Sequence, residues 1–437
     1  MQKKAFSPEE FLSDLFGVAV KAASPDFSKI KEKFPKEVEG KIIVIGAGKA
    51  AASMASSFEL SAKELWSDSA YQKIQGLVIT RYQHGSTCEK IKVVEASHPV
   101  PDEAGENAAH QIIQMLKDLT VNDLVVCLIS GGGSSLLTVP AEGISLDEKK
   151  LINKQLLACG ASISEINCVR KHLSKIKGGR LAEIAYPAKI MTYVISDVPG
   201  DDPSVIASGP TLPDETTCED ALKIIKKYRI AISELILNQL KSRKLETPKL
   251  NAHVFQNMQP PVVMGTAKQS IEAARMYAEN AGFNALVLSD SIEGEAADVG
   301  KVLGATALWL SENKEKNLPK PLVLISGGET TVTVKNCSGR GGRNTEFLLS
   351  LVNTLQGAKN IYAIAADTDG IDGSENNAGA IAGPETLQKA KNKGLSAKDY
   401  LERNDAYTFF QGIDGLLLTG PTRTNVNDFR AIVILES

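Results

Sequence analysis

The residues of this sequence best suited to chemistry occur in seven short segments that mix glycine with charged, amide or hydroxyl side chains. The segments follow apolar runs that are typical of β-strands. In open α/β sheets, ligands bind beyond the carboxyl ends of the strands. Any one segment could be a simple turn, but the seven together predict a binding cleft. They are GAGKAA (46–51), GGGSS (131–135), DVPGDDP (197–203), GGET (327–330), GRGGRN (339–344), DTDGIDG (367–373) and GPTRTNVND (420–428).

In the stretch VVCLISGGGSS (125–135), three consecutive glycines follow an apolar run that is typical of a buried strand. A glycine inside a regular element costs roughly 0.5–1 kcal/mol relative to alanine, so a run of three needs a reason. One reason is a tight turn into the next helix. The other is a loop whose backbone N–H groups lie against an anion with no Cβ in the way. The letters alone leave both readings open.

Phosphoryl transfer would use all of these parts. It requires donors for phosphate oxygens, cations for the developing charge and carboxylates that hold Mg²⁺. The glycine-rich segments supply backbone donors, and Lys49 and Arg343 supply the cations. Both cations open a helical stretch, where the macrodipole disfavours positive charge, so a functional role explains them better than a structural one. The hard oxygen ligands on offer are Asp197, Asp202, Glu329, Asp367, Asp369 and Asp372.

The segment around Lys49 also admits a rival reading. The P-loop pattern is not met, because Ile43 and Ala50 stand where it requires glycine and a hydroxyl residue. The segment 46–51 instead fits the relaxed dinucleotide fingerprint G-x-G-x-x-A. The next strand leads into Arg81 with no acidic residue for a ribose, although Arg81 suits a 2′-phosphate. Hydride transfer from NAD(P)H therefore stays open as an alternative.

Composition narrows the class of protein. The 437 residues carry a formal net charge of −3, which leaves no electrostatic footprint for nucleic acid or an anionic membrane. No apolar run approaches the roughly 18 residues of a transmembrane helix, and the first residues lack the apolar core of a signal peptide. Six cysteines without a C-x-x-C pair predict a reduced, cytoplasmic enzyme that acts on a small molecule. Homo-oligomer formation stays open.

The apolar runs alternate with amphipathic stretches, which predicts α/β layering over mostly parallel sheets. A polar segment at 238–260 that ends in Pro-Pro marks the boundary. We therefore expect a Rossmann-like domain at 1–245 and a second α/β domain at 246–437. In the second domain, strands at 321–327 and 330–334, and at 415–419 and 431–435, form close pairs that favour a mixed sheet. The letters LISGG occur at 128–132 and again at 324–328, each at an expected strand end.

At this point the motifs resemble a known family, the glycerate 2-kinases of class II with a MOFRL domain. The resemblance runs from about Gly46 to Asp428, nearly the whole chain. It implies ATP-dependent, Mg²⁺-assisted phosphorylation of D-glycerate at O2, giving 2-phosphoglycerate, in a cleft between two α/β domains. Members have often been labelled hydroxypyruvate reductases, which is the oxidoreductase alternative above. The motifs are SGGGSS, INCVRKHLS with KGGR, SDVPGDD with VIASGPT, GGETTVTV, GRGGRNTEF, DTDGIDG and TGPTRTNVND.

The resemblance also assigns roles by position. Lys49 and Arg343 match the family's basic active-site pair, and with Asp197 they are the expected catalytic residues. Two positions depart from the family, which usually has glutamine where Thr345 stands and glycine where Asp367 stands. The expected metal ligands are Asp197, Glu329 and Asp369. The expected nucleotide-binding residues are Gly46, Gly48, Gly131, Gly132, Gly133, Ser134, Ser135, Gly327 and Gly328.

Overall fold

A computed structural model describes residues 6–256, 258–312, 318–335 and 338–436. The chain divides into two compact units. Residues 25–264 form one unit, here called the parallel-sheet unit. The segment up to Ser24 joins residues 265–437 in the other, here called the mixed-sheet unit. Within the described residues, no helix combines the length and apolar character that a membrane span requires.

The parallel-sheet unit is built on a six-stranded sheet in the order β3-β2-β1-β4-β5-β6. Every pairing among its first five strands is parallel. All six residues of β1 and of β4 are buried, as expected for central strands covered on both faces. The strands are β1 (Ile42–Ala47), β2 (Ile74–Arg81), β3 (Ile91–Ala96), β4 (Leu124–Ile129), β5 (Lys189–Ile195) and β6 (Val262–Gly265).

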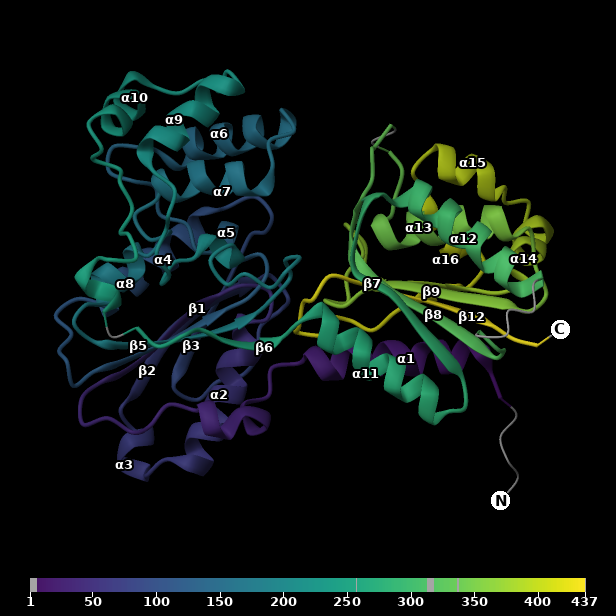
Figure 1. The fold of residues 1–437 in the computed structure, drawn as a ribbon, viewed down its shortest axis with the longest axis horizontal. Coiled ribbons are helices and arrows are strands. Elements are labelled where there is room, and N and C mark those ends of the chain that lie inside the picture. Colours follow the sequence, from purple (N-terminus) through teal and green to yellow (C-terminus); the bar gives the residue numbers. More distant parts are fainter. Residues whose placement is uncertain (1–5, 257, 313–317, 336–337, 437) are drawn as a thin grey trace. The chain divides into compact units, whose positions relative to one another are not determined.

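Helices cover both faces of this sheet (Figure 1). On one face, α2 (Ala51–Leu65) and α3 (Asp68–Tyr71) lie beside an aromatic cluster that includes Phe27, Phe58 and Tyr193. The other face carries α4, α5 and α8. A further layer of four helices has its own apolar core and lies beyond that face. These helices are α4 (Glu103–Met115), α5 (Gly133–Leu136), α6 (Leu146–Ala158), α7 (Ile163–His172), α8 (Arg180–Ala185), α9 (Cys218–Lys227) and α10 (Glu234–Lys241).

The mixed-sheet unit has strand order β11-β10-β9-β12-β8-β7. Only the β7–β8 pair is parallel among the pairings of its described strands. The structure thus confirms the α/β class, with a parallel sheet in one unit and a mixed sheet in the other. The strands are β7 (Asn284–Glu295), β8 (Leu322–Thr331), β9 (Ile361–Asp367), β10 (Gly379–Ala382), β11 (Leu416–Leu417) and β12 (Asp428–Ile434).

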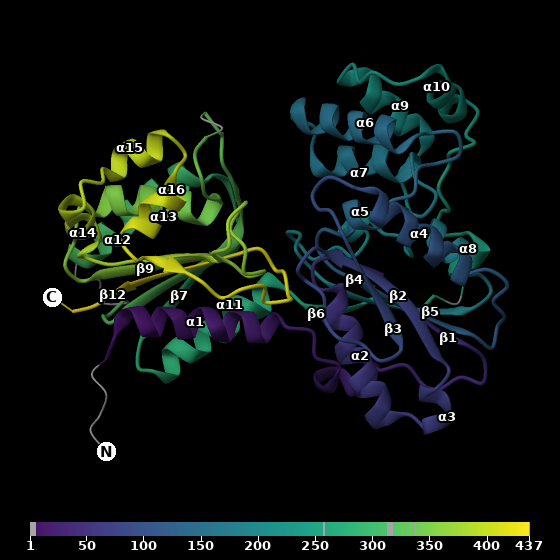
Figure 2. The same ribbon diagram turned by 180° about the vertical axis from the view of Figure 1, so that it is seen from behind.

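Alternating side chains of this sheet enter two separate cores. On β12, Ile432 and Ile434 join one core with α12 and α13, whereas Ala431 and Val433 join another with α1 and α11. Figure 2 shows the sheet between these two pairs of helices. Arg343 opens a helix, α13, as the sequence predicted. The helices are α1 (Pro8–Ala23), α11 (Ala267–Asn280), α12 (Ala296–Glu312), α13 (Arg343–Leu355), α14 (Thr386–Asn392), α15 (Ala397–Glu402) and α16 (Ala406–Gly412).

The division of the chain differs from the expected 1–245 and 246–437 at both edges. Helix α1 buries Leu12 and Leu15 in the core of the mixed-sheet unit, so the first helix folds with the last third of the chain. At the other edge, β6 is the sixth strand of the parallel sheet, which carries that unit to Met264. The polar segment that suggested a boundary at 245 connects α10 to this strand instead.

Two expected strands of the mixed sheet need correction. Strand β8 does not stop before Gly327 but continues to Thr331, because Gly328 and Gly327 pair with Asp428 and Phe429 on β12. The expected strand 330–334 is therefore not a separate one, and its pairing with 321–327 is wrong. Strand β11 pairs with β10, a strand that sequence reasoning missed, and not with 431–435.

Candidate active site

In the parallel-sheet unit, the loops after β1 and β4 lie side by side. These strands are neighbours at the centre of the sheet, and the chain order reverses between them. This switch point is where doubly wound sheets bind their ligands. The backbone N–H of Lys49 donates to Gly131 O at 2.8 Å, and Ala50 N donates to Ser130 Oγ at 3.0 Å. The first of the expected catalytic cations therefore lies against the SGGGSS loop, just before α2.

Close packing accounts for several glycines of these two loops. Gly46 lies within β1 and not in the loop after it, and a Cβ there would come 2.2 Å from Leu128 O. Its role in binding the nucleotide stays a prediction. Gly48 has φ +138°, and a Cβ on it would stand 2.1 Å from Ser130 Oγ. Gly133 leaves only 2.7 Å to the Cβ of Ala207. The structural reading of the glycine run thus holds at these positions: the loops approach too closely for side chains.

The serines of the same loop belong to a polar network. Ser134 Oγ lies 2.6 Å from Ser208 Oγ, and Ser208 Oγ donates to Asn167 Oδ1 at 3.0 Å. Ser135 Oγ donates to Gly132 O at 3.0 Å within the loop itself. The SGGGSS loop is thereby connected to α7 and to the segment around Ser208.

Asp197, the expected base or metal ligand of this unit, follows β5 by two residues and is half-buried. Strand β5 is parallel to β4 and adjacent to it. The carboxyl ends of parallel neighbours share one sheet edge, so Asp197 is placed at the edge that also carries Lys49 and the SGGGSS loop.

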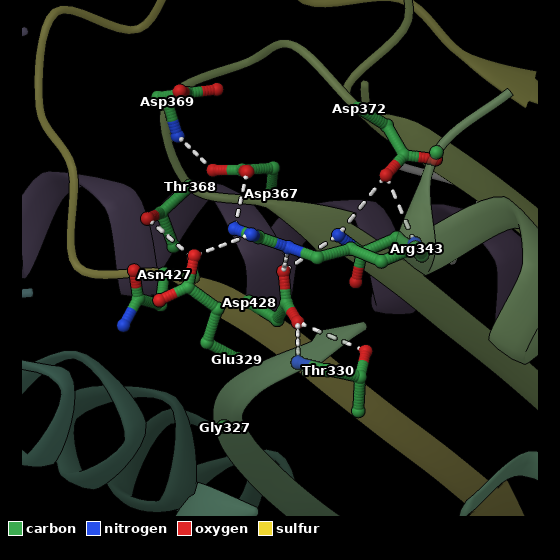
Figure 3. A network of polar contacts seen from close by, with 12 residues as sticks. Gly327, Glu329, Thr330, Arg343, Asp367, Thr368, Asp369, Asp372, Asn427 and Asp428 are labelled. Carbon is green, nitrogen blue, oxygen red and sulfur yellow. Dashed lines mark hydrogen bonds and ion pairs between the residues drawn. The ribbon is translucent and has the colours of Figure 1, made fainter. Parts of the chain in front are cut away.

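In the mixed-sheet unit, Arg343 is the first residue of α13 and contacts three carboxylates (Figure 3). Its Nε donates to Asp428 Oδ1 at 2.7 Å, its Nη1 to Glu329 Oε1 at 2.6 Å and its Nη2 to Asp367 Oδ2 at 2.9 Å. The three partners come from the ends of three adjacent strands, β12, β8 and β9. Sheet order therefore assembles this cluster from residues that are far apart in the sequence.

The charge of Arg343 is fixed by these contacts. Burial alone would lower its pKa, but the carboxylates of Asp428, Asp367 and Glu329 raise it well above the ordinary value. The Asp428 side chain is fully buried, and the Asp367 side chain is only 5% exposed. Glu329 is 49% exposed and is the most accessible partner of the guanidinium.

A second carboxylate cradle adjoins the first. Asp372 is fully buried and accepts hydrogen bonds from the backbone N–H of Asn344 at 2.9 Å and of Thr345 at 2.8 Å (Figure 3). Thr345 Oγ1 donates to the same carboxylate at 2.8 Å. Burial raises the pKa of Asp372, and these hydrogen bonds oppose the rise. Thr345, one of the two family departures, thus holds the first turn of α13 on Asp372.

Asp369 is buried and forms a local turn. Its Oδ1 accepts from Ile371 N at 2.8 Å, and its own N–H donates to Asp367 Oδ1 at 3.0 Å (Figure 3). The structure therefore brings Asp369 and Glu329 into one network through Asp367 and Arg343. Asp367, the other family departure, is a direct partner of the expected catalytic arginine.

Gly327 and Gly328 lie inside β8 and not in a loop after it, and their role in binding the nucleotide stays a prediction. A Cβ on Gly327 would meet Ile271 Cδ1 at 2.7 Å, and one on Gly328 would meet Ile292 O at 2.2 Å. Gly328 also has φ +118°, which disfavours other residues. Their place is explained by close packing against neighbouring segments. The repeated letters LISGG accordingly have different structures in the two units.

Sequence reasoning assigned no particular role to Asp428 and missed Arg430. Asp428 accepts from Arg343, from Asn344 Nδ2 at 2.8 Å and from Arg430, which also donates to Thr330 Oγ1 at 3.0 Å. Arg430 is 1% exposed. A buried arginine inside the apolar run of β12 was the available signal, because such a charge requires a paired carboxylate.

Comparisons with known proteins decide the family. A family described as a domain of unknown function, DUF4147, matches residues 11–241, and the MOFRL family matches residues 322–428. A D-glycerate 2-kinase of Thermotoga maritima is 39% identical over 97% of this chain and 98% of its own. The chain belongs to the glycerate 2-kinase family. The crystal structure of a glycerate kinase from the same organism superposes with a TM-score of 0.85 at 38% identity, covering 98% of this chain and 99% of that one.

Hydroxypyruvate reductase is an alternative label within this glycerate 2-kinase family. An Agrobacterium vitis protein that carries it as a provisional name is 48% identical over 90% of this chain and all of its own. The label matches the oxidoreductase alternative from the sequence. In the structure, β2 ends at Arg81, with no acidic residue at the strand end where dinucleotide enzymes hold a ribose.

A further cluster of side chains in this chain consists of residue types that can bind metal ions. Ligand atoms of His172, Cys218 and Glu246 all lie within 4.8 Å of one another. Burial raises the pKa of Cys218 to about 12, which keeps the thiol protonated, and Lys249 Nζ already lies 2.7 Å from Glu246 Oε1. Mg²⁺ prefers oxygen ligands, so the Arg343 cluster fits it better than this group does.

Proposed function

We propose that this chain is a D-glycerate 2-kinase that transfers the terminal phosphoryl group of ATP to O2 of D-glycerate, giving 2-phosphoglycerate and ADP. The relatives named glycerate kinases support the substrate class and the reaction. Two groups of residues support this function, each within its own unit: the switch-point loops of the parallel-sheet unit and the Arg343 cluster of the mixed-sheet unit. The free cysteines among the described residues support a cytoplasmic location.

One observation carries the proposal: carboxylates outnumber guanidinium groups in the Arg343 cluster. Asp428 contacts both guanidinium groups, those of Arg343 and Arg430. The other four carboxylates of the network belong to Glu329, Asp367, Asp369 and Asp372. A surplus of hard oxygen donors favours a divalent cation, and the donor set fits Mg²⁺. We assign Glu329 and Asp369 of this cluster as residues that would hold it. When bound, Mg²⁺ supplies charge neutralisation for the phosphate oxygens.

The chain's own residues perform the remaining steps. Lys49 binds the glycerate carboxylate or the transferring phosphoryl group. Arg343 stabilises transition-state charge through Nη1, whose carboxylate partner among the described residues, Glu329, is half-exposed. Asp197 accepts the proton of the O2 hydroxyl. The bond between O2 and the γ-phosphorus forms as the bond from that phosphorus to the bridging oxygen breaks, and the electron pair stays on ADP.

Phosphorus NMR tests the reaction directly. After incubation with ATP, Mg²⁺ and D-glycerate, we expect resonances of 2-phosphoglycerate and ADP in equal amounts. A 3-phosphate product would contradict the regiochemistry, and no phosphorylated product would contradict the reaction class. A parallel assay with hydroxypyruvate and NADPH tests the reductase alternative, for which nicotinamide absorbance would fall without ATP.

A further inference from the structure

Lys149 on α6 is a buried cation for which the reaction above has no use. The residue is 3% exposed, and its Nζ has no hydrogen-bond partner within the described part of the chain. Burial and, to a smaller extent, the charge of Arg170 lower the pKa of Lys149 to about 7, although the Glu106 carboxylate opposes this shift. Buried charges are normally paired, so an unpaired lysine in the interior requires an explanation.

Two more cations accompany Lys149. Lys177 is 1% exposed, and its Nζ donates only weakly, at 3.4 Å, to Ala207 O. Arg170 is half-buried on α7. Neither these two nor Lys149 forms an ion pair with a carboxylate of the residues described. Burial lowers the pKa of Lys177 well below its ordinary value, and the charges of Lys149 and Arg170 lower it further, so the three are close enough to repel one another.

A hydrogen bond places Arg170 beside the helix that carries Lys149. Arg170 Nε donates to Asn153 Oδ1 at 3.2 Å. Asn153 lies four residues after Lys149 on α6, and residues at this spacing share a helix face. Arg170 therefore lies along the face of α6 that carries Lys149.

The same region adjoins the SGGGSS loop. Lys177 contacts Ala207, and the next residue, Ser208, bonds to both Ser134 and Asn167. Asn167 lies three residues before Arg170 on α7, which puts both on one helix face. Hydrogen bonds and shared helix faces thus relate all three cations to the loop at the switch point of the sheet.

We propose that Lys149, Arg170 and Lys177 form an oxyanion site beside the SGGGSS loop that takes the phosphate groups of the nucleotide. The inference rests on the proposed kinase function and deepens it by naming the residues that hold the nucleotide's phosphates. Three cations that repel one another are stabilised together when an anion enters. Their number matches a chain of phosphates, which carries several negative charges, better than a single carboxylate.

Calorimetric titration of the full-length protein with inorganic tripolyphosphate tests the site without catalysis. We expect wild type to bind, Lys149→Met to bind at least tenfold more weakly, and Lys150→Met to bind as wild type does. Lys150 is the matched control because it is the next residue on α6 and contacts Asp147. Arg170→Met, at a half-buried position, should weaken binding in the same way and serves if Lys149→Met does not fold.

Titrations with ADP and with D-glycerate show whether the site binds the phosphates of the nucleotide or the carboxylate of the substrate. Weaker ADP binding with unchanged D-glycerate binding in Lys149→Met supports the proposal. Weaker D-glycerate binding alone, or tripolyphosphate affinity equal to wild type in both variants, overturns it. The outcome is separable from the kinase proposal: loss of product in the NMR experiment with retained, Lys149-dependent tripolyphosphate binding would reject the reaction and keep the site.

Discussion

Arg343 Nε donates to Asp428 Oδ1 at 2.7 Å, and this bond joins the first residue of α13 to the first residue of β12. The Asp428 side chain is fully buried and also contacts Arg430 and Asn344. Because one buried carboxylate anchors two guanidinium groups, the position of Arg343 is set by the sheet and not by its own loop. The cluster is therefore expected to be rigid before any substrate binds.

Arg343→Lys should lower kcat by about 10²–10³-fold, because an ammonium group cannot contact three carboxylates at the geometry of the guanidinium fork. The substitution also leaves buried carboxylates without their partner, so unfolding free energy should fall by about 3 kcal/mol or more. ADP release and urea unfolding measure the two effects. Arg340→Lys is the control, since Arg340 forms an exposed ion pair with Glu375 and should change stability by less than about 1 kcal/mol.

Lys49→Met should lower kcat/KM for D-glycerate by about 10²-fold or more while leaving the fold intact. The side chain is half-buried, and the loop is held by backbone bonds such as that from Lys49 N to Gly131 O, which the substitution retains. Steady-state kinetics would measure the loss of kcat/KM, and thermal unfolding would show that stability is retained. Lys63→Met, on the exposed face of α2, should leave both unchanged. Equal losses of kcat/KM in Lys49→Met and Lys63→Met would contradict a role for Lys49 in the active site.

Glu329→Gln should raise the Mg²⁺ concentration needed for half-maximal ADP release several-fold, because an amide is a weaker ligand for a hard cation than a carboxylate. Glu329 is half-exposed, so the change should cost little stability. Mg²⁺ titration of the initial rate is the measurement. Glu375→Gln, which removes a carboxylate paired with Arg340, is the matched control. An unchanged Mg²⁺ requirement would place the metal elsewhere.

Stability should depend on the ionisation of Glu346, which is 4% exposed and accepts from Asn404 Nδ2 at 2.9 Å. Burial raises the pKa of Glu346 to about 7 from an ordinary value of 4.5. Between these values the folded protein binds more protons than the unfolded chain, so stability falls as pH rises from 4.5 to 7. The loss should reach about 3 kcal/mol or less. Urea unfolding at pH 5 and pH 7.5 measures it, and Glu346→Gln should flatten this part of the profile.

Gly133→Ala should destabilise the protein by about 1–3 kcal/mol, since the added methyl group would stand 2.7 Å from the Cβ of Ala207. Gly17→Ala, inside α1 with open space around it, should instead stabilise by about 0.5–1 kcal/mol. Thermal unfolding compares them. If the two changes had the same sign, close packing would not be the reason for glycine at position 133.

The alternation of apolar and amphipathic runs predicted the α/β class and the helix that Arg343 opens, because these depend on local periodicity. Glycine at 327 and 328 was interpreted as a strand end, yet β8 continues, because pairing with β12 outweighs a local preference that only weakly opposes a strand. The unit with which α1 folds could not be predicted either. Its apolar face specifies burial but not a partner, and the partner is encoded in residues after 265.

The candidate site shows the same limit. The sequence placed Lys49 and the SGGGSS loop among the segments that follow strands, and a backbone hydrogen bond from Lys49 N to Gly131 O joins these two segments. The three partners of Arg343 could not be chosen from the several acidic residues that follow strands. Which carboxylates meet depends on the order β9-β12-β8, and that order is set by pairing between distant segments.

The chain starts and finishes in the same unit, with residues 25–264 inserted between. During synthesis, α1 leaves the ribosome first, but the strands and α11 that bury Leu12 and Leu15 are translated only after the whole insertion. The inserted unit can complete its own core in the meantime, because domains fold as units once their residues are available. The apolar side of α1 therefore lacks its partners until the residues after 264 have been translated.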